Sequence, residues 1–430
     1  MHEQTILDLG VFEPDYTRDP YPLYSKLRES MPVQQVLLHG LRAWLVTRYD
    51  DVRRALNHPG LSNDRRNASP AARTAAWLFA DEALELQHHM LRSDPPQHTR
   101  IRRLAAHAFT ARRVAELGPR IQRIADELID DFVDRGSAEL VSAYAFPLPL
   151  RIIVEILGVP TEDRERLLGW SDVLSSGGAV QEVEIVDTLT SMRDFFRDLV
   201  RRKRERRDGE DGGLLDALVT ACYSDSELNE AELLSSAFQL LQGGHVTTLG
   251  LIANGTLALL RAPERLAMLR TDPDLVDPAI DELLRFEAPM EVATVRFTTR
   301  ELRIGDVTIP GGGEPVILAL AAANRDPARF ADPDVLDFGR DCSGHLAFGY
   351  GAHYCLGAHL ARAEARIGLR TLITRLDGLA LAVDPSELDW RPNPHLRRPE
   401  RLPVTFTPGD RKHHDHTSRP TIPPRREQWK

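Results

Sequence analysis

Apolar residues recur at helical spacing over much of the chain. The stretch from residue 121 to 132 shows this most clearly, because five apolar residues share one face of a predicted helix: Ile121, Ile124, Leu128, Ile129 and Phe132. Gly136 is placed to end that helix. Helical patterns dominate from residue 98 to about residue 290, and a short helix with Pro at its start is predicted over 20–30.

Alternation of apolar and polar residues, typical of strands, is confined to short stretches. The predicted strands lie within residues 33–38, 43–47, 295–320, 379–383 and 402–406. Gly305 and Asp306 favour a hairpin turn, and a further helix is predicted from Asp50.

The remaining segments show no regular pattern. Residues 60–97 are irregular and rich in small and polar side chains. Residues 409–430 are basic and rich in His and Pro, so we predict a disordered tail. Its HHDH run at 413–416 could bind a metal ion, but a solvated tail is the favoured interpretation. The chain shows no internal repeat and no linker long enough to divide it.

The longest predicted helix has a weak point in its interior. Asn229 followed by Glu232 has the pattern of a capping box, and Pro263 marks the far end. About 30 residues at about 1.5 Å each give about 45 Å, so this helix must run through the core. The run GGHVTT at 243–248 weakens it, since Gly costs roughly 1 kcal/mol relative to Ala and Thr crowds the preceding turn. We therefore expect this part to face a group that needs space.

Composition narrows the class of protein. The 430 residues are 42% hydrophobic and 27% charged, enough for a large core, and the length alone permits two or three domains. A net charge of −10 argues against a nucleic-acid partner.

We find no apolar run of membrane-spanning length and no signal-peptide pattern, so we expect a cytoplasmic protein without membrane association. Cys222, Cys342 and Cys355 have neither metal-type nor disulfide spacing, which suits a reducing compartment.

Cys355 and its neighbours form a candidate site. Gly349, Gly351 and Gly357 surround it, and a strongly periodic helix begins directly after it. The positive end of that helix favours a thiolate, and the glycines let the backbone bend and aim N–H groups at the sulfur. These features suit a thiolate bound to one face of a flat metal cofactor. A buried Cys in a Gly-rich turn is the alternative; zinc is disfavoured because no partner Cys or His lies at zinc spacing.

The run from Phe348 to Gly357, FGYGAHYCLG, resembles the haem-binding loop of the cytochrome P450 superfamily at every fixed position of Phe-Gly-x-Gly-x-His-x-Cys-x-Gly. The resemblance implies that Cys355 binds the iron of haem b as a thiolate, with Phe348, Gly349 and Gly357 in the cofactor site.

The same resemblance covers about residues 15–408 and implies a mainly α fold, a single helical domain with a small β-sheet region, of the soluble bacterial type. We assign 1–408 to this haem domain. Glu282 and Arg285 resemble the Glu-x-x-Arg pair that braces the family's core near the haem. Without that context they would be an ordinary surface pair.

Haem propionates need cations or hydrogen-bond donors from the protein. The resemblance assigns this role to His98, Arg102, Arg296 and His353, with His345 as a further candidate. His98 and Arg102 are four residues apart and share one helix face. Without the family context, the two would be interpreted as solvated residues on a polar helix.

GGHVTT in turn resembles the family's oxygen-binding groove, where Ala/Gly-Gly-x-acid-Thr-Thr is usual. Gly243 and Gly244 would leave room beside the iron. Thr247, followed by Thr248, would hydrogen-bond dioxygen there and pass protons. The alternative is that Thr247 bonds the carbonyl one turn back at an ordinary helix kink.

Val246 departs from the family pattern, which has Asp or Glu at this position to deliver protons. Val cannot donate, accept or relay a proton. Three accounts are open: water chains ending at Thr247, Thr248 or His245 replace the acid; the substrate brings its own hydroxyl or carboxylate; or the reaction tolerates slow protonation. Replacement by a water or a substrate group is the hypothesis we favour.

The resemblance implies a haem-thiolate monooxygenase, a hydroxylase or epoxidase, acting on a small organic substrate. We expect a bacterial natural-product intermediate, either free or bound to a carrier protein. Residues 60–97 and 175–180 would form a lid. Candidate contacts are Leu240, Leu241, Ala293, Thr294 and the residues around Trp77.

Electrons would come from NAD(P)H through a ferredoxin reductase and an acidic ferredoxin, because the chain shows no flavin or nicotinamide motif. A basic docking patch could include Arg100, Arg103, Arg112 and Arg113, although a solvated helix face fits them equally. We expect a monomer.

Two alternatives to the monooxygenase function are open. The first is oxidative coupling, desaturation or peroxide-supported oxidation at the same haem. The second is a haem sensor without turnover, and the presence of Thr247 argues against it.

Overall fold

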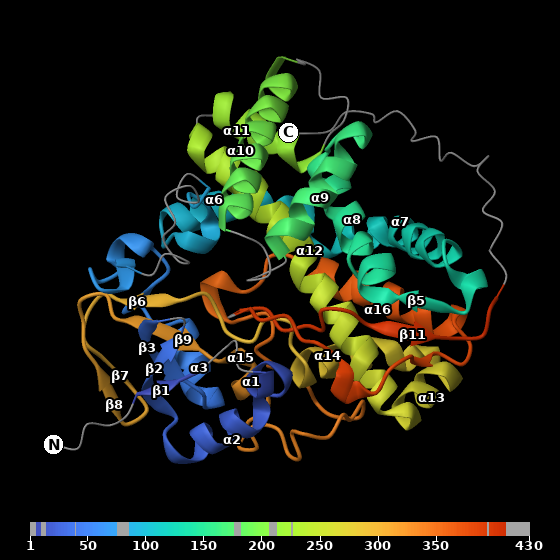
Figure 1. Cartoon of the computed structure of the whole chain (residues 1–430). Coiled ribbons are helices and arrows are strands. Elements are labelled where there is room, and N and C mark those ends of the chain that lie inside the picture. Colours follow the sequence, from blue (N-terminus) through green and yellow to red (C-terminus); the bar gives the residue numbers. More distant parts are fainter. Residues whose placement is uncertain are drawn as a thin grey trace.

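The computed structural model of the chain describes residues 6–9, 14–38, 40–74, 86–175, 182–205, 213–224, 227–393 and 395–409. Helices make up most of it, as predicted (Figure 1). The helices are α1 Pro14–Arg18, α2 Tyr21–Ser30, α3 Tyr49–Leu56, α6 Gln97–Ala106, α7 Ala111–Asp130, α8 Pro147–Leu157, α9 Arg164–Ser175, α10 Glu182–Glu205, α11 Leu214–Tyr223, α12 Glu230–Arg261, α13 Pro263–Thr271, α14 Val276–Phe286, α15 Leu320–Asn324 and α16 Ala358–Arg375. The strands are β1 Leu7–Asp8, β2 Val33–Leu38, β3 Leu41–Val46, β4 Leu61–Ser62, β5 Ser137–Glu139, β6 Arg296–Thr298, β7 Leu302–Ile304, β8 Val307–Ile309, β9 Pro315–Leu318, β10 Ala380–Leu381 and β11 Pro403–Thr405.

Some predicted features lie outside the described residues: the tail beyond residue 409, Trp77, and the lid residues at 176–180. Among the helices that the structure describes, none combines the length and apolar character needed to cross a bilayer.

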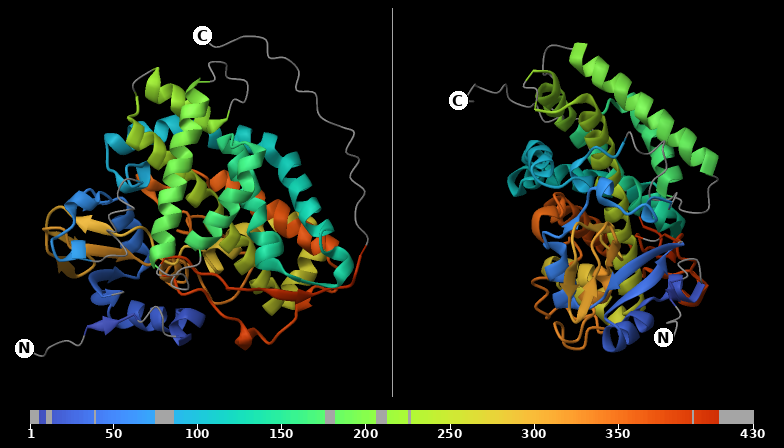
Figure 2. Two further views of the ribbon diagram at one scale, coloured as in Figure 1. Left: turned by 45° about the horizontal axis from the view of Figure 1, so that its top comes forward. Right: turned by 90° about the vertical axis from the view of Figure 1, so that its left-hand side faces the viewer.

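Helix α12 crosses the middle of the molecule and contacts α8, α10, α14 and α16 (Figures 1 and 2). Its 32 residues span about 48 Å at about 1.5 Å each. The predicted capping box is present. Asn229 Oδ1 accepts from the Glu232 N–H at 2.9 Å, and the Glu232 carboxylate accepts from the Asn229 N–H at 3.1 Å. The helix is continuous through 243–248, so the weak interior does not break it.

The two adjacent glycines of α12 meet different neighbours. A Cβ on Gly244 would lie 2.5 Å from Ile153 Cγ1, so α12 and α8 can approach this closely only with Gly at this position. A Cβ on Gly243 would meet only the side-chain amide of Gln239, at 3.2 Å. Both glycines line a cavity, as the sequence suggests, but helix packing is a second and separate requirement at Gly244.

The largest sheet has six strands in the order β1-β2-β3-β9-β6-β4. The predicted strands β2 and β3 pair antiparallel, with Gln35 opposite Trp44. Strand β9 pairs parallel with β3 and antiparallel with β6. Because β6 is held between β9 and β4, the sheet fixes the backbone of Arg296, its first residue.

The remaining strands form two smaller sheets. In the β7–β8 hairpin Ile304 pairs with Val307, and Gly305 makes the turn with φ +55°, as predicted. The strands predicted within 379–383 and 402–406 pair as β10 and β11, and β5 joins them as a third strand. The sequence pattern did not predict β5, whose three residues are too few to show alternation.

A buried ion pair on α14 fixes the chain that leads to the Cys355 loop. The side chains of Glu282 and Arg285 are fully buried and 2.6 Å apart. Arg285 also donates to the carbonyls of Asn324 and Pro333, at 3.0 and 2.8 Å. Glu282 accepts from the N–H of Asp337 at 2.9 Å. The pair thus holds the segment after α15 against α14.

Gly244→Ala should lower the free energy of unfolding by about 1–3 kcal/mol, because the added methyl group would overlap Ile153 in a packed core. Gly243→Ala is the matched control, since the gain in helix propensity, about 1 kcal/mol, is the same and only a flexible Gln239 amide must move. Chemical denaturation of the two variants measures the difference. Equal stabilities would contradict the packing explanation.

Candidate active site

The loop that carries Cys355 is bent by glycines and closed by a backbone hydrogen bond. Gly349 and Gly351 have φ values of +72° and +78°, which L side chains rarely adopt. The Cys355 N–H donates to the carbonyl of Phe348 at 2.9 Å. Gly357 has an ordinary φ of −87° and is the N-cap of α16. The thiol is therefore held at the N-terminal end of α16, as predicted.

Burial raises the pKa of the Cys355 thiol, whereas the Gly357 N–H and the guanidinium groups of Arg102 and Arg362 lower it. Burial outweighs them, so the protein environment by itself favours the thiol, contrary to the expectation from the helix end alone. A metal ion at the sulfur would reverse this balance, because coordination deprotonates a thiol. The N–H and the two guanidinium groups would then stabilise the thiolate.

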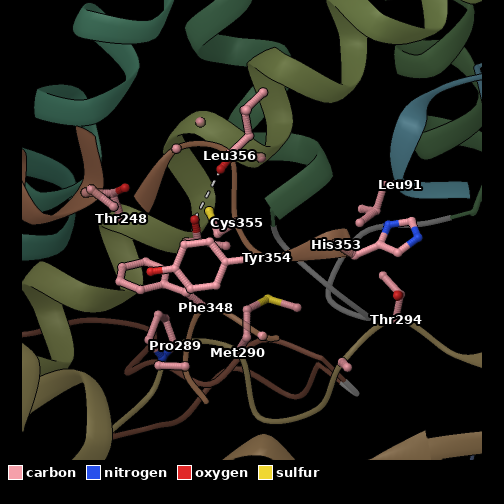
Figure 3. Close-up of a pocket in the computed structure, with 18 of the residues that line it drawn as sticks. Leu91, Thr248, Pro289, Met290, Thr294, Phe348, His353, Tyr354, Cys355 and Leu356 are labelled. Atoms are coloured by element: carbon pink, nitrogen blue, oxygen red, sulfur yellow. Dashed lines mark hydrogen bonds between the residues drawn. The ribbon is translucent and has the colours of Figure 1, made fainter. Parts of the chain in front are cut away.

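A cavity separates the Cys355 loop from α12. Figure 3 shows Cys355 near the centre of this pocket, with Thr248 on one side, Leu91, His353 and Thr294 on the other, and Met290 nearby. Most of the lining is apolar, with residues from distant parts of the chain such as Leu91, Leu240, Leu251, Met290, Ala293 and Leu360. A thiol therefore opens into a space that otherwise suits an apolar molecule.

One part of the cavity wall is rich in donors that lack an anionic partner. The residues concerned are His98, Arg102, Arg296 and His353. Both ring nitrogens of His98 and the Nε of Arg296 are buried without a hydrogen-bond partner. Neither arginine forms an ion pair in the part of the chain that the structure describes. Burial lowers the pKa of Arg296 to about 10. This set fits haem b, because two propionate carboxylates would satisfy the donors while Cys355 supplies the iron ligand.

Asn63, which the sequence analysis missed, joins His353 to Thr294. Its side chain is buried, with Nδ2 2.8 Å from His353 Nε2 and Oδ1 3.0 Å from the Thr294 hydroxyl that donates to it. Since Oδ1 accepts from Thr294, the amide NH₂ donates to His353 Nε2 and leaves the proton on Nδ1. Burial, and then neighbouring cations, lower the pKa of His353 to about 3, so the ring is neutral.

Within the GGHVTT run of α12, four residues line the cavity: Gly243, Gly244, Thr247 and Thr248. Val246 does not line it. The Thr247 hydroxyl donates to the carbonyl of Gly243 at 3.1 Å, which is the back-bond that the sequence left open as an alternative. Its lone pairs can still accept a hydrogen bond. Thr248 is buried and lines the cavity together with Glu364 of α16.

Three residues expected near the cavity lie elsewhere. His345 contacts Asp281 at 3.3 Å and lines a separate surface groove, so it is not placed to meet a propionate. His245 is buried in the core, where its Nδ1 lies 2.7 Å from the carbonyl of Leu241. Leu241 itself packs in the hydrophobic core. The predicted substrate contacts that do line the cavity are Leu240, Ala293 and Thr294.

Each arginine of the predicted basic patch pairs with an acidic side chain, and Arg112 and Arg113 share one. The pairs are Arg100–Glu232 at 2.5 Å, Arg103–Glu227 at 2.8 Å, Arg112–Glu116 at 3.3 Å and Arg113–Glu116 at 3.7 Å. Arg100 and Arg103 lie on α6 and pair with acidic residues at the start of α12, whereas Arg112 and Arg113 lie on α7. The four arginines are therefore not the free positive surface that the sequence analysis considered.

Glu364 is a further cavity residue that the sequence analysis missed. It is fully buried on α16, one helical turn from both Leu360 and Gly368. A carboxylate within such an apolar stripe was the signal available in the sequence.

Comparisons with known proteins agree with this site. The family model described as Cytochrome P450 matches residues 180–389. Cytochrome P450 monooxygenase PikC of Streptomyces venezuelae is 44% identical over 94% of this chain and 95% of its own. Cytochrome P450 107B1 of Saccharopolyspora erythraea is 41% identical over 92% and 97%. The tirandamycin C-bound structure of the P450 monooxygenase TamI has a TM-score of 0.85 at 40% identity, covering 93% of this chain and 100% of that one.

Arg296→Met should weaken haem retention. A charge-assisted hydrogen bond contributes about 1.5–3 kcal/mol, which corresponds to roughly 10- to 150-fold in the dissociation constant. Arg300→Met is the control, because Arg300 is exposed on the same segment. Transfer of haem to excess apomyoglobin, followed at the Soret band, measures retention. Equal transfer from the two variants would show that Arg296 does not hold a propionate.

Proposed function

The chain belongs to the cytochrome P450 superfamily and is a haem b monooxygenase, and from this premise we propose that it hydroxylates or epoxidises a free, largely apolar natural-product intermediate. The apolar cavity that opens onto Cys355 is the observation that carries the proposal. A substrate there is held mainly by burial of apolar surface, with Thr294 and Gln239 among the few polar groups that could orient it.

The roles of the site residues follow from their contacts. Cys355 would bind the iron, and His98, Arg102, Arg296 and His353 would hold the propionates. When bound, haem supplies the iron at which dioxygen is activated for insertion of one oxygen atom into the substrate. The backbone turns at Gly349 and Gly351 keep Cys355 in place. Thr247 Oγ1 can only accept a further hydrogen bond in the cavity, because its own proton is given to the carbonyl of Gly243.

Relatives show how broad the substrate class is. They include a 6-deoxyerythronolide B hydroxylase and a mycinamicin IV hydroxylase/epoxidase, and a P450BioI structure carries an acyl carrier protein with its fatty acid. We favour a free compound for this chain, because apolar side chains such as Leu91, Leu240 and Met290 make up most of the cavity lining.

Oxidation without oxygen insertion is the second candidate, and Val246 is the observation that favours it. The P450 enzyme CxnD, described as forming a C–S bond, has a similar structure with a TM-score of 0.86 at 34% identity. Mass analysis of the product formed under isotopically labelled dioxygen separates the two candidates, since only insertion adds labelled oxygen.

Titration of the ferric enzyme tests the substrate class. We expect at least one free apolar natural product, among macrolactones and acyl tetramic acids, to shift the Soret band to the high-spin form, because it displaces water from the cavity. Carrier-bound acyl chains are the comparison. A shift with carrier-bound compounds alone would overturn the proposal of a free substrate.

The electron donor we propose is a ferredoxin, reduced by NAD(P)H through a ferredoxin reductase in the cytoplasm. A surface groove shares Gly349, Tyr350 and Tyr354 with the cavity, so it lies across the Cys355 loop from the substrate. Arg53 stacks on the exposed Tyr350 ring at 4.4 Å. Within the described residues Arg53 makes no ion pair, so its charge is available to an acidic protein.

Arg53→Glu should slow reduction of the substrate-bound enzyme by an acidic ferredoxin about tenfold at low salt, because the change reverses a charge at the docking surface. The effect should shrink at high ionic strength, where the charges are screened. Arg201→Glu is the control, since Arg201 lies on α10 at the other end of the molecule (Figure 1). Stopped-flow measurement of the first electron transfer gives the rates; equal rates for both variants would exclude this docking surface.

A further inference from the structure

Asn63 connects the cavity wall to one of the side chains that would hold a haem propionate. Its own side chain is buried and does not line the cavity. Its Oδ1 accepts from the hydroxyl of Thr294, which does line the cavity, at 3.0 Å. Its Nδ2 donates to His353 Nε2 at 2.8 Å. Figure 3 shows His353 and Thr294 on the same side of the pocket.

The backbone of Asn63 is held independently of these two bonds. Its N–H donates to Asp94 Oδ1 at 3.1 Å, and the carbonyl of Asp94 accepts from the His98 N–H at 2.9 Å at the start of α6. The ring centroids of His98 and His353 lie 4.2 Å apart. Replacing the Asn63 side chain therefore removes the two amide bonds but leaves this backbone anchor to α6 in place.

The Asn63 amide can satisfy its neighbours in two arrangements. In the arrangement of the structure, Thr294 donates to the amide oxygen and the amide nitrogen donates to His353 Nε2, which leaves the ring proton on Nδ1. If the amide turns over, its nitrogen donates to the Thr294 hydroxyl and its oxygen accepts from Nε2, so that Nδ1 carries no proton. Because Asn63 occupies Nε2 in both, Nδ1 is the nitrogen left for a propionate, and only the first arrangement offers a donor there.

The two arrangements also differ in what Thr294 offers to the cavity. In the first, its proton is given to Asn63, so the hydroxyl can only accept from a molecule in the cavity. In the second, its proton is free for the cavity. A ketone, which can only accept, therefore requires the second arrangement and the loss of the His353 donor. An alcohol can donate to Thr294 and leaves the first arrangement intact.

We propose that Asn63 is a positioning residue that makes the cavity select substrates able to donate a hydrogen bond to Thr294, such as alcohols. The selection comes from His353, which can keep its hydrogen bond to a propionate only while the amide is in the first arrangement. When the amide turns, the ring proton changes from Nδ1 to Nε2 and the ring stays neutral. This substrate class deepens the proposed monooxygenase function and rests on it.

Binding of two matched apolar probes to the ferric holoenzyme tests the selection. Cyclododecanol and cyclododecanone have the same ring and differ in whether the oxygen can donate. The dissociation constant of the alcohol, measured from the Soret shift, should be about tenfold lower, because only the ketone requires His353 to give up a charge-assisted hydrogen bond. Equal affinities, or a preference for the ketone, would overturn the proposal.

Asn63→Leu should abolish this preference, mainly by strengthening the binding of the ketone, because the Thr294 hydroxyl is then free to donate into the cavity. Thr294→Val should abolish it by removing the hydroxyl. Asn67→Leu is the matched control and should keep the native preference, since the Asn67 amide is on the same segment but donates to Ser62 Oγ at 2.8 Å. An equal loss of affinity for both probes in Asn63→Leu would mean that Asn63 has only a structural role.

Resonance Raman spectroscopy of the same complexes gives a readout at the cofactor. In the native enzyme the propionate bending band of the ketone complex should differ from that of the alcohol complex, because His353 no longer donates from Nδ1. In Asn63→Leu the two complexes should have the same band. Identical bands for the two native complexes would contradict the transmission from Thr294 to His353.

Neither measurement depends on turnover, so the inference and the proposed function can fail separately. If the native enzyme forms product but does not prefer the alcohol, the selection by Asn63 is refuted and the monooxygenase function stands. If it prefers the alcohol but forms no product from any compound, the proposed function fails and the connection between Thr294 and His353 stands.

Discussion

Glu282 and Arg285 carry opposite charges into a part of the protein that water does not reach, and the position of the active-site thiol depends on them. Desolvating two charges costs several kcal/mol per ion, so such a pair persists only where further hydrogen bonds satisfy both groups. Arg285 meets this requirement through backbone carbonyls, and Glu282 through the N–H of Asp337 and the guanidinium of Arg340 at 3.3 Å. Asn324, one of the residues held in this way, accepts from the Leu346 N–H at 2.6 Å and passes the constraint to the Cys355 loop.

Features that depend on neighbours in the sequence were predictable. The capping box of Asn229 and Glu232 needs residues three positions apart, and the turn at Gly305 needs two adjacent ones. The loop around Cys355 is equally local, because its glycines and the following helix lie within one short stretch. These patterns predicted the longest helix and the hairpin without tertiary information, and the resemblance of the Cys355 loop implied the haem ligand.

Features that depend on tertiary contacts were not predictable. The requirement for Gly at 244 comes from Ile153 on another helix. Arg100 forms an ion pair with Glu232, which lies 132 residues away in the sequence. The pKa of the Cys355 thiol also depends on tertiary contacts, since the Gly357 N–H that lowers it is local and the burial that raises it is not. Glu364 shows both effects: its position in an apolar stripe is visible in the sequence, but the cavity that it lines is formed by residues from several parts of the chain.

The hydrogen bonds of Asn63 have a consequence for protein engineering. Thr294 lines the cavity, so it is a natural position to vary when a library is built to change regioselectivity. It also fixes the orientation of the Asn63 amide, and that orientation sets the tautomer of His353 at the cofactor edge. A library that replaces Thr294 by apolar residues releases this amide, and it alters haem anchoring together with selectivity. Varying positions 63 and 294 jointly would keep the two properties separable.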